Sequence, residues 1–437
     1  MRLTDDLKDL ATVPAFRTLL GVRLVSQTGD GMVQAGLATL FFFQPQNMTT
    51  AAGVASALVV MLLPFSLVGP FTGPFIDRWR RRQTLLWGNL LRAGLIALTA
   101  LVLHAAGTGA AVYVLVLVAL GINRFLLSVL SAGLPQVIDH RRLLVANSLV
   151  PTLGGAATAT GAVIGIILRL LLPAGSVQDA ASLVSAVVLY VLAAAVVTRL
   201  GAGELGPEHP TSEGTARALA ATVCELADAV RYLRRRGTPG LALSTMALHR
   251  FVYGMQLITI ILTSRNLLAA PEDADLGLAL FGTLMGAMIA GHGLSIVLTP
   301  LAHERVAPST WIVMCLLGGS LGQLVLVASH AQAAMTVGLL IFGAGVQGAK
   351  IAVDTIVQSD TADAYRGRAF SIYDVLFNTA ECVAAGVAVL VLPDVGWSRP
   401  AQAALVLFVW CVALWYLHGV RRLGDQPREV AGLPGLD

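Results

Sequence analysis

The sequence predicts an all-α protein that crosses a membrane with about twelve helices, and three observations carry that prediction. Hydrophobic residues make up 56% of the 437 residues, and charged residues make up only 12%. A soluble domain carries roughly 25% charged residues. The mean hydropathy is +0.77. The apolar residues also form long runs, and about 20 such residues are needed for each helix that crosses the hydrocarbon core.

The apolar runs fall into two sets of six, with a polar segment between them. The sequence therefore predicts an N-terminal six-helix bundle within 1–200, a linker at 201–240 and a C-terminal six-helix bundle within 241–437. The predicted spans are 16–43, 51–72, 83–104, 109–133, 148–172, 178–199, 241–263, 276–301, 309–329, 332–357, 369–392 and 401–420.

Arginine and lysine are concentrated on one side of the predicted membrane. The clusters at 78–82 and 234–236 and the pairs at 141–142 and 421–422 all fall on this side, whereas the other side holds little beyond Arg265 and Arg399. Cytoplasmic loops carry the excess of basic residues. We therefore expect both termini and the linker to be cytoplasmic, in a cell (inner or plasma) membrane. The acidic start of the chain does not resemble a cleavable signal peptide.

The second half of the linker has the spacing of an amphipathic helix. Its apolar residues follow a 4-3-4-3 spacing that forms one stripe, and Gly237 and Pro239 then end the helix. Such a helix can lie on the inner leaflet or against the bundle, or it can be a simple spacer. The stripe consists of Leu219, Val223, Leu226, Val230 and Leu233.

A short polar turn separates the second and third predicted spans. Residues 73–82 read GPFIDRWRRR, which places one acid and four arginines between two apolar runs. A charged side chain at the membrane centre costs roughly 2.5–3.5 kcal/mol, so this turn must face water. The pattern Gly-x-x-x-Asp-Arg-x-x-Arg-Arg resembles the signature loop of the major facilitator superfamily. The resemblance implies two six-helix bundles around a cavity that opens alternately to each side.

The same resemblance implies a latch between the two halves that breaks when the cavity opens inward. In this latch the acid of the turn faces the start of the eleventh helix, where residues 366–368 resemble the Arg-Gly-Arg segment of one branch of the superfamily. The residues expected to form it are Gly73, Asp77, Arg78, Arg81, Arg82, Arg366 and Arg368.

Two acids lie deep inside predicted spans, where an ionisable group is a candidate functional site. Asp30 lies about 21 Å along the first helix at a rise of 1.5 Å per residue, and Glu381 about 18 Å along the eleventh. We expect Asp30 as the first choice for a proton carrier and Glu381 as the second, and each can instead be half of a structural ion pair. The segment Arg-x-x-Ser-x-x-Gly-Asp that ends at Asp30 resembles the first helix of enterobactin-exporter-like and drug-efflux carriers.

Other charged residues inside spans have weaker assignments. Arg124 occupies a place where the resemblance implies proton coupling, as a counter-charge to Asp30 or Asp77, or it is a helix-end arginine that reaches the interface. We expect Arg92 to support the polar turn. Lys350 and Asp354 are four residues apart on one helix face and can form an ion pair.

No feature of the sequence indicates catalysis or a bound cofactor. A nucleotide-binding Gly-x-x-x-x-Gly-Lys-Ser/Thr segment, a His-Glu-x-x-His segment and a Gly-x-Ser-x-Gly segment are all absent. The four cysteines are far apart, and we expect free thiols and no metal site. The basic residues follow the membrane topology, so they do not predict nucleic-acid binding.

The sequence thus favours a proton-coupled secondary transporter in the lipid bilayer that exports an amphipathic or hydrophobic small molecule and is not an enzyme. The resemblance implies a monomer. Movement of a lipid or lysolipid between leaflets is a second hypothesis, and a membrane scaffold or sensor without transport activity is a third. The residues expected to line the substrate cavity are Gln34, Tyr253, Gln256 and Asn378.

Overall fold

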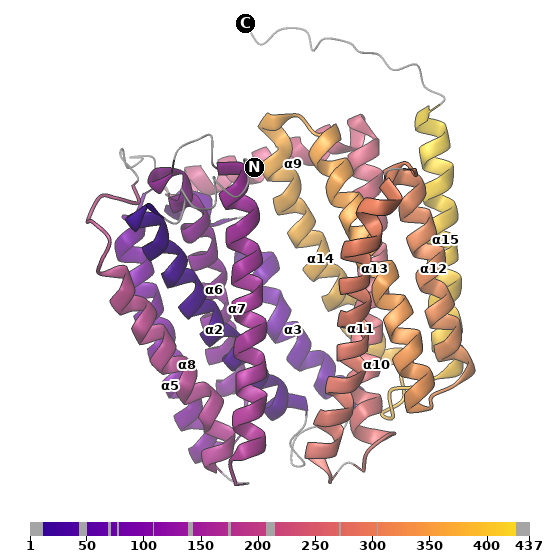
Figure 1. Ribbon diagram of the computed structural model, residues 1–437, viewed down its shortest axis with the longest axis horizontal. Coiled ribbons are helices and arrows are strands. Elements are labelled where there is room, and N and C mark those ends of the chain that lie inside the picture. The colour runs from indigo at the N-terminus through magenta and orange to yellow at the C-terminus, as the bar shows by residue number, and fades with distance from the viewer. Residues whose placement is uncertain are drawn as a thin grey trace, which may run out of the picture. The chain divides into compact units, whose positions relative to one another are not determined.

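The structure is a computed structural model in which the described residues are helical, without strands (Figure 1). These residues are 12–42, 50–68, 71–76, 78–107, 109–138, 143–173, 176–206, 215–270, 272–303 and 305–424. Within these ranges the long helices that match predicted spans are α2 (Pro14–Phe42), α3 (Ala51–Val68), α5 (Arg81–Ala106), α6 (Ala110–Val137), α7 (Leu143–Leu171), α8 (Ser176–Val197), α10 (Thr238–Asn266), α11 (Ala274–His303), α12 (Pro308–Ala328), α13 (Gln332–Asp360), α14 (Asp363–Val391) and α15 (Arg399–Gly424).

Each predicted span is present as one of these helices, and the predicted and observed ends agree within six residues. In the part of the chain that the structure describes, ten of the helices are long and apolar enough to cross a membrane. The other two, α2 and α3, contain 29 and 18 residues and match the first two predicted spans. The prediction of an all-α membrane fold with twelve long helices is confirmed.

The helices form two compact units. The first comprises Met1–Cys224 with Ile261–Leu280 and Ala385–Leu390, and the second comprises the rest of the chain. In the first unit, α2 packs against α7 and α8, and α5 packs against α6 and α8. A Cβ atom on Gly161 of α7 would lie 1.9 Å from the carbonyl oxygen of Thr28 on α2. The two backbones therefore touch, as is common where small residues line membrane helices.

In the second unit, α12 packs against α13 and α15. The contact between α12 and α13 is also made by glycines. A Cβ atom on Gly322 would lie 2.2 Å from the carbonyl oxygen of Gly338, whereas one on Gly318 would meet nothing within 4 Å. Two glycines on the same helix thus differ in whether the neighbouring helix leaves space for a side chain.

Gly322→Ala should therefore lower the stability of the protein, and Gly318→Ala should not. Forcing a methyl group against backbone costs about 1–3 kcal/mol, so we expect the melting temperature of the Gly322→Ala protein in detergent to fall by about 1–3 °C. Equal melting temperatures for the two variants would contradict the close contact of α12 with α13.

The helix predicted in the linker is present as α9 (Thr215–Arg236). It ends at Arg236, and the next residue, Gly237, has a φ of 82°, which favours glycine. Its apolar stripe is divided between two environments, because Leu233 is 3% exposed whereas Val223 and Val230 are 53% and 41% exposed. One edge of the stripe packs against protein, and the other remains uncovered.

Residues of α9 contact the start of α14 within the second unit. Tyr232 stacks on Tyr365, with ring centroids 4.2 Å apart and planes inclined by 3°, and its hydroxyl accepts a hydrogen bond of 3.0 Å from the backbone N–H of Ala362. Glu225 forms an ion pair of 3.0 Å with Arg368. These contacts attach α9 to the connection between α13 and α14.

Candidate functional site

The first buried charge network lies where α2, α5 and α8 meet in the first unit. Asp30 of α2 forms an ion pair with Arg92 of α5. The hydroxyl of Tyr190 on α8 donates a hydrogen bond of 2.9 Å to Asp30 Oδ1 and accepts one of 2.8 Å from Arg92 Nη2. The three residues are 4%, 2% and 1% exposed. Asp30 therefore has a fixed counter-charge and little contact with solvent.

Further polar groups hold the arginine in place. Arg92 Nη1 donates to Ser26 Oγ at 3.1 Å, and Ser26 donates to Asn89 Oδ1 at 3.2 Å. The Arg92 guanidinium also lies over the Tyr190 ring, 4.0 Å from its centroid. A Cβ atom on Gly29 would lie 2.8 Å from Cε1 of Tyr190. The Gly-Asp pair in α2 thus combines the acid with the space that its tyrosine partner needs.

This network corrects two expectations about the arginines. Arg92 does not support the polar turn, because its side chain is the counter-ion of Asp30. The sequence also offered Arg124 as a counter-charge for Asp30, and the structure gives that place to Arg92. Arg124 is half-buried on α6, and its role in coupling stays a prediction. The position of Arg92 in the sequence could have indicated this role, because it lies eleven residues inside a 26-residue span and therefore far from the polar turn.

The second buried charge network joins α10 and α14 in the second unit. Glu381 of α14 forms an ion pair with Arg250 of α10, and their side chains are 6% and 22% exposed. The Arg250 guanidinium lies 3.9 Å from the ring centroid of Tyr253 and 4.9 Å from that of Phe377. A Cβ atom on Gly254 would lie 2.8 Å from Cβ of Ala384, so a glycine again allows the two helices to approach.

The surroundings of Glu381 include several residues that sequence reasoning named. Tyr253 stacks on His292, with ring centroids 6.4 Å apart. Asn378 is half-buried, and its Nδ2 donates to the carbonyl oxygen of Asp374 at 2.7 Å. Sequence reasoning missed Arg250 as the partner of Glu381. The sequence did contain a signal for this pair, because Arg250 and Glu381 carry opposite charges and both lie inside predicted spans.

The remaining cavity residues lie in different environments. Gln34 is half-buried on α2. Gln256 is 0% exposed and donates to Gln402 Oε1 at 2.6 Å. This corrects its assignment to the cavity wall, because Gln256 is fully buried and its amide nitrogen is bonded to Gln402 of α15 inside the unit. On α13, Lys350 Nζ lies 2.6 Å from Asp354 Oδ2.

The polar turn contains α4 (Gly73–Ile76) and the start of α5. Arg81 is buried and donates to the carbonyl oxygens of Ala132 and Leu205 at 3.0 and 3.1 Å. Arg82 donates to the carbonyl oxygen of Thr198 at 3.1 Å. These arginines therefore tie the turn to α6 and to the segment that follows α8, within the first unit.

The other latch residues have separate partners or are not described. Asp77 lies outside the described residues. Arg78 is exposed. Arg366 donates to the carbonyl oxygen of Thr361 at 3.4 Å, and Arg368 pairs with Glu225 of α9. The latch between the halves stays a prediction.

The described residues contain no cluster of three or more side chains suited to a metal ion. What the arrangement can do follows from its two acid–arginine pairs. A carboxylate that shares a low-dielectric site with an arginine can gain or lose a proton only if the arginine finds other partners. The exposed fraction of Arg250 gives its pair more access to such partners than Arg92 has.

Comparison with known proteins decides the family. Residues 20–385 match the profile of the Major Facilitator Superfamily. The chain belongs to this superfamily. Curated relatives from Mycobacterium tuberculosis and Mycobacterium bovis, both described as uncharacterized MFS-type transporters, are 32% identical over 400 residues, which cover 90% of this chain and 88% of each relative.

Solved structures show the same major facilitator fold. The nucleoside transporter NupG matches with a TM-score of 0.60 and 13% identity, over 94% of this chain and 99% of that one. An auto-inhibited peptide transporter of the POT family matches with a TM-score of 0.65 and 12% identity, over 92% and 97% of the two chains. The protein is thus a multi-pass membrane transporter of the major facilitator type.

Proposed function

We propose that this major facilitator transporter is a proton-coupled carrier that exports an amphipathic or hydrophobic small molecule by alternating access. The ion pair between Glu381 and Arg250 is the observation that carries the proposal. It joins a buried acid to an arginine that is 22% exposed and lies among aromatic rings. This arrangement combines a group that can bind a proton with a surface that can bind an organic molecule.

Electrostatics supplies the coupling. An ionised carboxylate that is buried without a counter-charge costs several kcal/mol. In this proposal Glu381 is therefore ionised only while Arg250 faces it. When substrate or a change of conformation draws Arg250 away, Glu381 binds a proton instead. Moving one charge through the membrane potential is worth about 2.3 kcal/mol per 100 mV, so one or two protons suffice for accumulation.

We rank Glu381 above Asp30 as the proton carrier. The side chain of Arg92, the partner of Asp30, is 3% exposed, compared with 22% for Arg250. Asp30 is also held by the Tyr190 hydroxyl. In this proposal Asp30 and Arg92 form the more rigid pair, and Arg124 has an auxiliary part in proton transfer.

Two other features support the direction of transport and the choice of branch. The segment that ends at Asp30 and the segment 366–368 resemble those of enterobactin-exporter-like and drug-efflux carriers. The rings of Tyr253 and Phe377 suit an aromatic or aliphatic substrate. We place the carrier in the inner or plasma membrane with both termini cytoplasmic, because its basic residues concentrate on one side of the predicted membrane. A monomer is the state that the resemblance implies.

The test uses the purified protein in liposomes that carry an imposed proton gradient and an internal pH dye. Candidate siderophores, antibiotics and lysolipids are added in turn. We expect at least one amphipathic compound to cross the membrane and to dissipate the gradient at a rate proportional to its flux. Transport at the same rate with and without the gradient would reject proton coupling, and such transport of a lysolipid would instead favour lipid translocation.

A further inference from the structure

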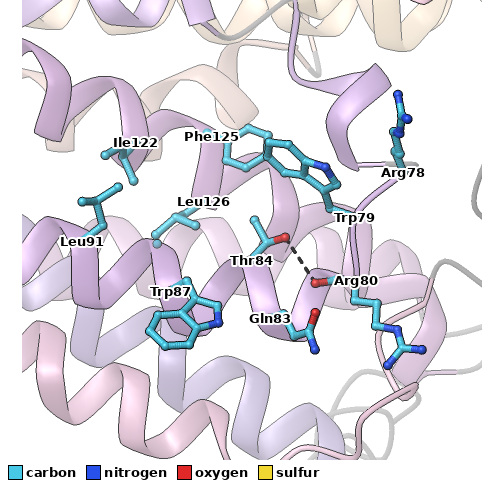
Figure 2. A pocket seen from close by; sticks show the side chains of 11 residues that line it. Arg78, Trp79, Arg80, Gln83, Thr84, Trp87, Leu91, Ile122, Phe125 and Leu126 are labelled. Atoms are coloured by element: carbon cyan, nitrogen blue, oxygen red, sulfur yellow. Dashed lines mark hydrogen bonds between the residues drawn. The ribbon is translucent and has the colours of Figure 1, made fainter. Parts of the chain in front are cut away.

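A groove on the first unit lies between the beginning of α5 and the middle of α6 (Figure 2). Its volume is about 600 Å³. The groove is separate from both buried ion pairs, since none of the residues in those pairs lines it. Neither the polar turn as a latch nor the proposed transport accounts for it.

Along the groove the side chains change from basic to apolar. Arg80 stands at the N-cap of α5. Thr84, Trp87 and Leu91 follow it at intervals of four, three and four residues, so they share one face of the helix. Leu91 lies eleven residues beyond Arg80, which is roughly 16 Å along the axis. Ile122 of α6 lines the apolar end with Leu91.

Aromatic side chains form the walls, and a close helix contact forms the floor. Trp79 packs edge-on against Phe125, with ring centroids 6.0 Å apart. Trp87 is 65% exposed on the opposite wall. A Cβ atom on Gly88 would lie 2.5 Å from Cδ2 of Leu126, so α5 and α6 touch beneath the groove. Tryptophan is enriched at the boundary between headgroups and hydrocarbon.

Charge identifies the occupant. The mouth carries Arg78 and Arg80, both exposed, and no acid is found among the described residues that line the groove. The cytoplasmic leaflet holds anionic lipids, which attract basic residues near its surface. The side chains of the two arginines project to opposite sides (Figure 2), and a phosphate at Arg80 would leave an acyl chain beside Leu91 and Ile122.

We propose that this groove binds one anionic phospholipid of the cytoplasmic leaflet. The phosphate is held by Arg80 at the N-cap of α5, the glycerol region lies between Trp79 and Trp87, and one acyl chain follows the apolar end. This site differs from the surrounding lipid layer in selecting a negative headgroup. A lipid bound at this site would also contact the turn that contains α4.

Native mass spectrometry of the full chain tests the headgroup. The detergent-solubilised protein is mixed with phosphatidylglycerol or phosphatidylcholine, and the fraction that retains one lipid is measured. We expect phosphatidylglycerol to be retained several-fold more, and Arg78→Ala with Arg80→Ala to remove this preference. The matched control changes Arg421→Ala and Arg422→Ala, which are exposed at the end of α15, and should leave retention unchanged. Equal retention of the two lipids, or equal loss in the control, would overturn the proposal.

A second measurement locates the lipid without removing a charge. Brominated phosphatidylglycerol, added at a few molecules per protein to phosphatidylcholine liposomes, quenches nearby tryptophans. We expect Trp87→Phe to remove most of the quenched signal, and Trp415→Phe, which replaces a tryptophan that is 45% exposed on α15, to remove little. Quenching that falls equally in both variants would indicate an unselective lipid layer and reject the site.

Discussion

Arg92→Met should prevent the protein from folding stably, because it leaves the carboxylate of Asp30 buried without a counter-charge. Breaking a buried ion pair by removal of one partner costs about 3–5 kcal/mol, which is a large part of the stability of most proteins. The tyrosine hydroxyl at 2.9 Å cannot neutralise the charge that remains. Thermal unfolding in detergent should show the melting temperature falling by about 3–5 °C, as expected from that cost for a chain of 437 residues, or no cooperative transition.

The double change Asp30→Leu with Arg92→Met is the matched control. Replacing both members of a buried pair by apolar residues is often neutral or stabilising, so the double variant should regain most of the lost stability. Tyr190→Phe removes one hydrogen bond and should cost only about 1–2 kcal/mol. An Arg92→Met protein that melts like the wild type would show that Asp30 is not a buried anion.

Glu381→Gln should abolish accumulation driven by the proton gradient while leaving exchange of substrate across the membrane. Glutamine keeps the size and hydrogen-bonding oxygen of the side chain but cannot bind or release a proton in this range. Arg250 then has no charged partner and is free in both states. In proteoliposomes, gradient-driven flux should fall at least tenfold, whereas exchange of labelled for unlabelled substrate should change less than about threefold, an energy of roughly 0.7 kcal/mol.

Asp354→Asn is the matched control for this prediction. It removes another acid from inside a span, and its partner Lys350 is 35% exposed, so solvent can take over part of its role. We expect it to keep coupled transport, and Asp30→Asn to reduce coupling less than Glu381→Gln does. Full gradient-driven accumulation in the Glu381→Gln protein would reject Glu381 as the proton carrier.

The sequence alone predicted the helices well because membrane insertion is governed by local composition. Each helix satisfies its own backbone hydrogen bonds, so an apolar run of sufficient length is almost a sufficient signal. The end of α9 was equally local, since Gly237 takes a left-handed conformation that glycine favours. Even the longest disagreement, at the start of α14, was six residues.

The ion pairs could not be predicted in the same way, because they depend on which helices are neighbours. Asp30 and Arg92 are 62 residues apart, and Arg250 and Glu381 lie on α10 and α14, with three other helices between them in the sequence. Sequence reasoning found both acids by their depth but offered the wrong arginine for Asp30 and none for Glu381. The assignment of Gln256 to the cavity wall was wrong for the same reason, because its partner Gln402 lies on a helix that is distant in the sequence.

The attachment of α9 determines where the chain can be cut. A protein produced as two separate halves is a common way to follow how such carriers assemble, and the natural choice is a break in the middle of the polar segment. In this protein Tyr232 stacks on Tyr365, and Glu225 pairs with Arg368. A break before Thr215 keeps these partners on one polypeptide, whereas a break at Gly237 would leave the second fragment with an unsatisfied arginine and an uncovered tyrosine ring.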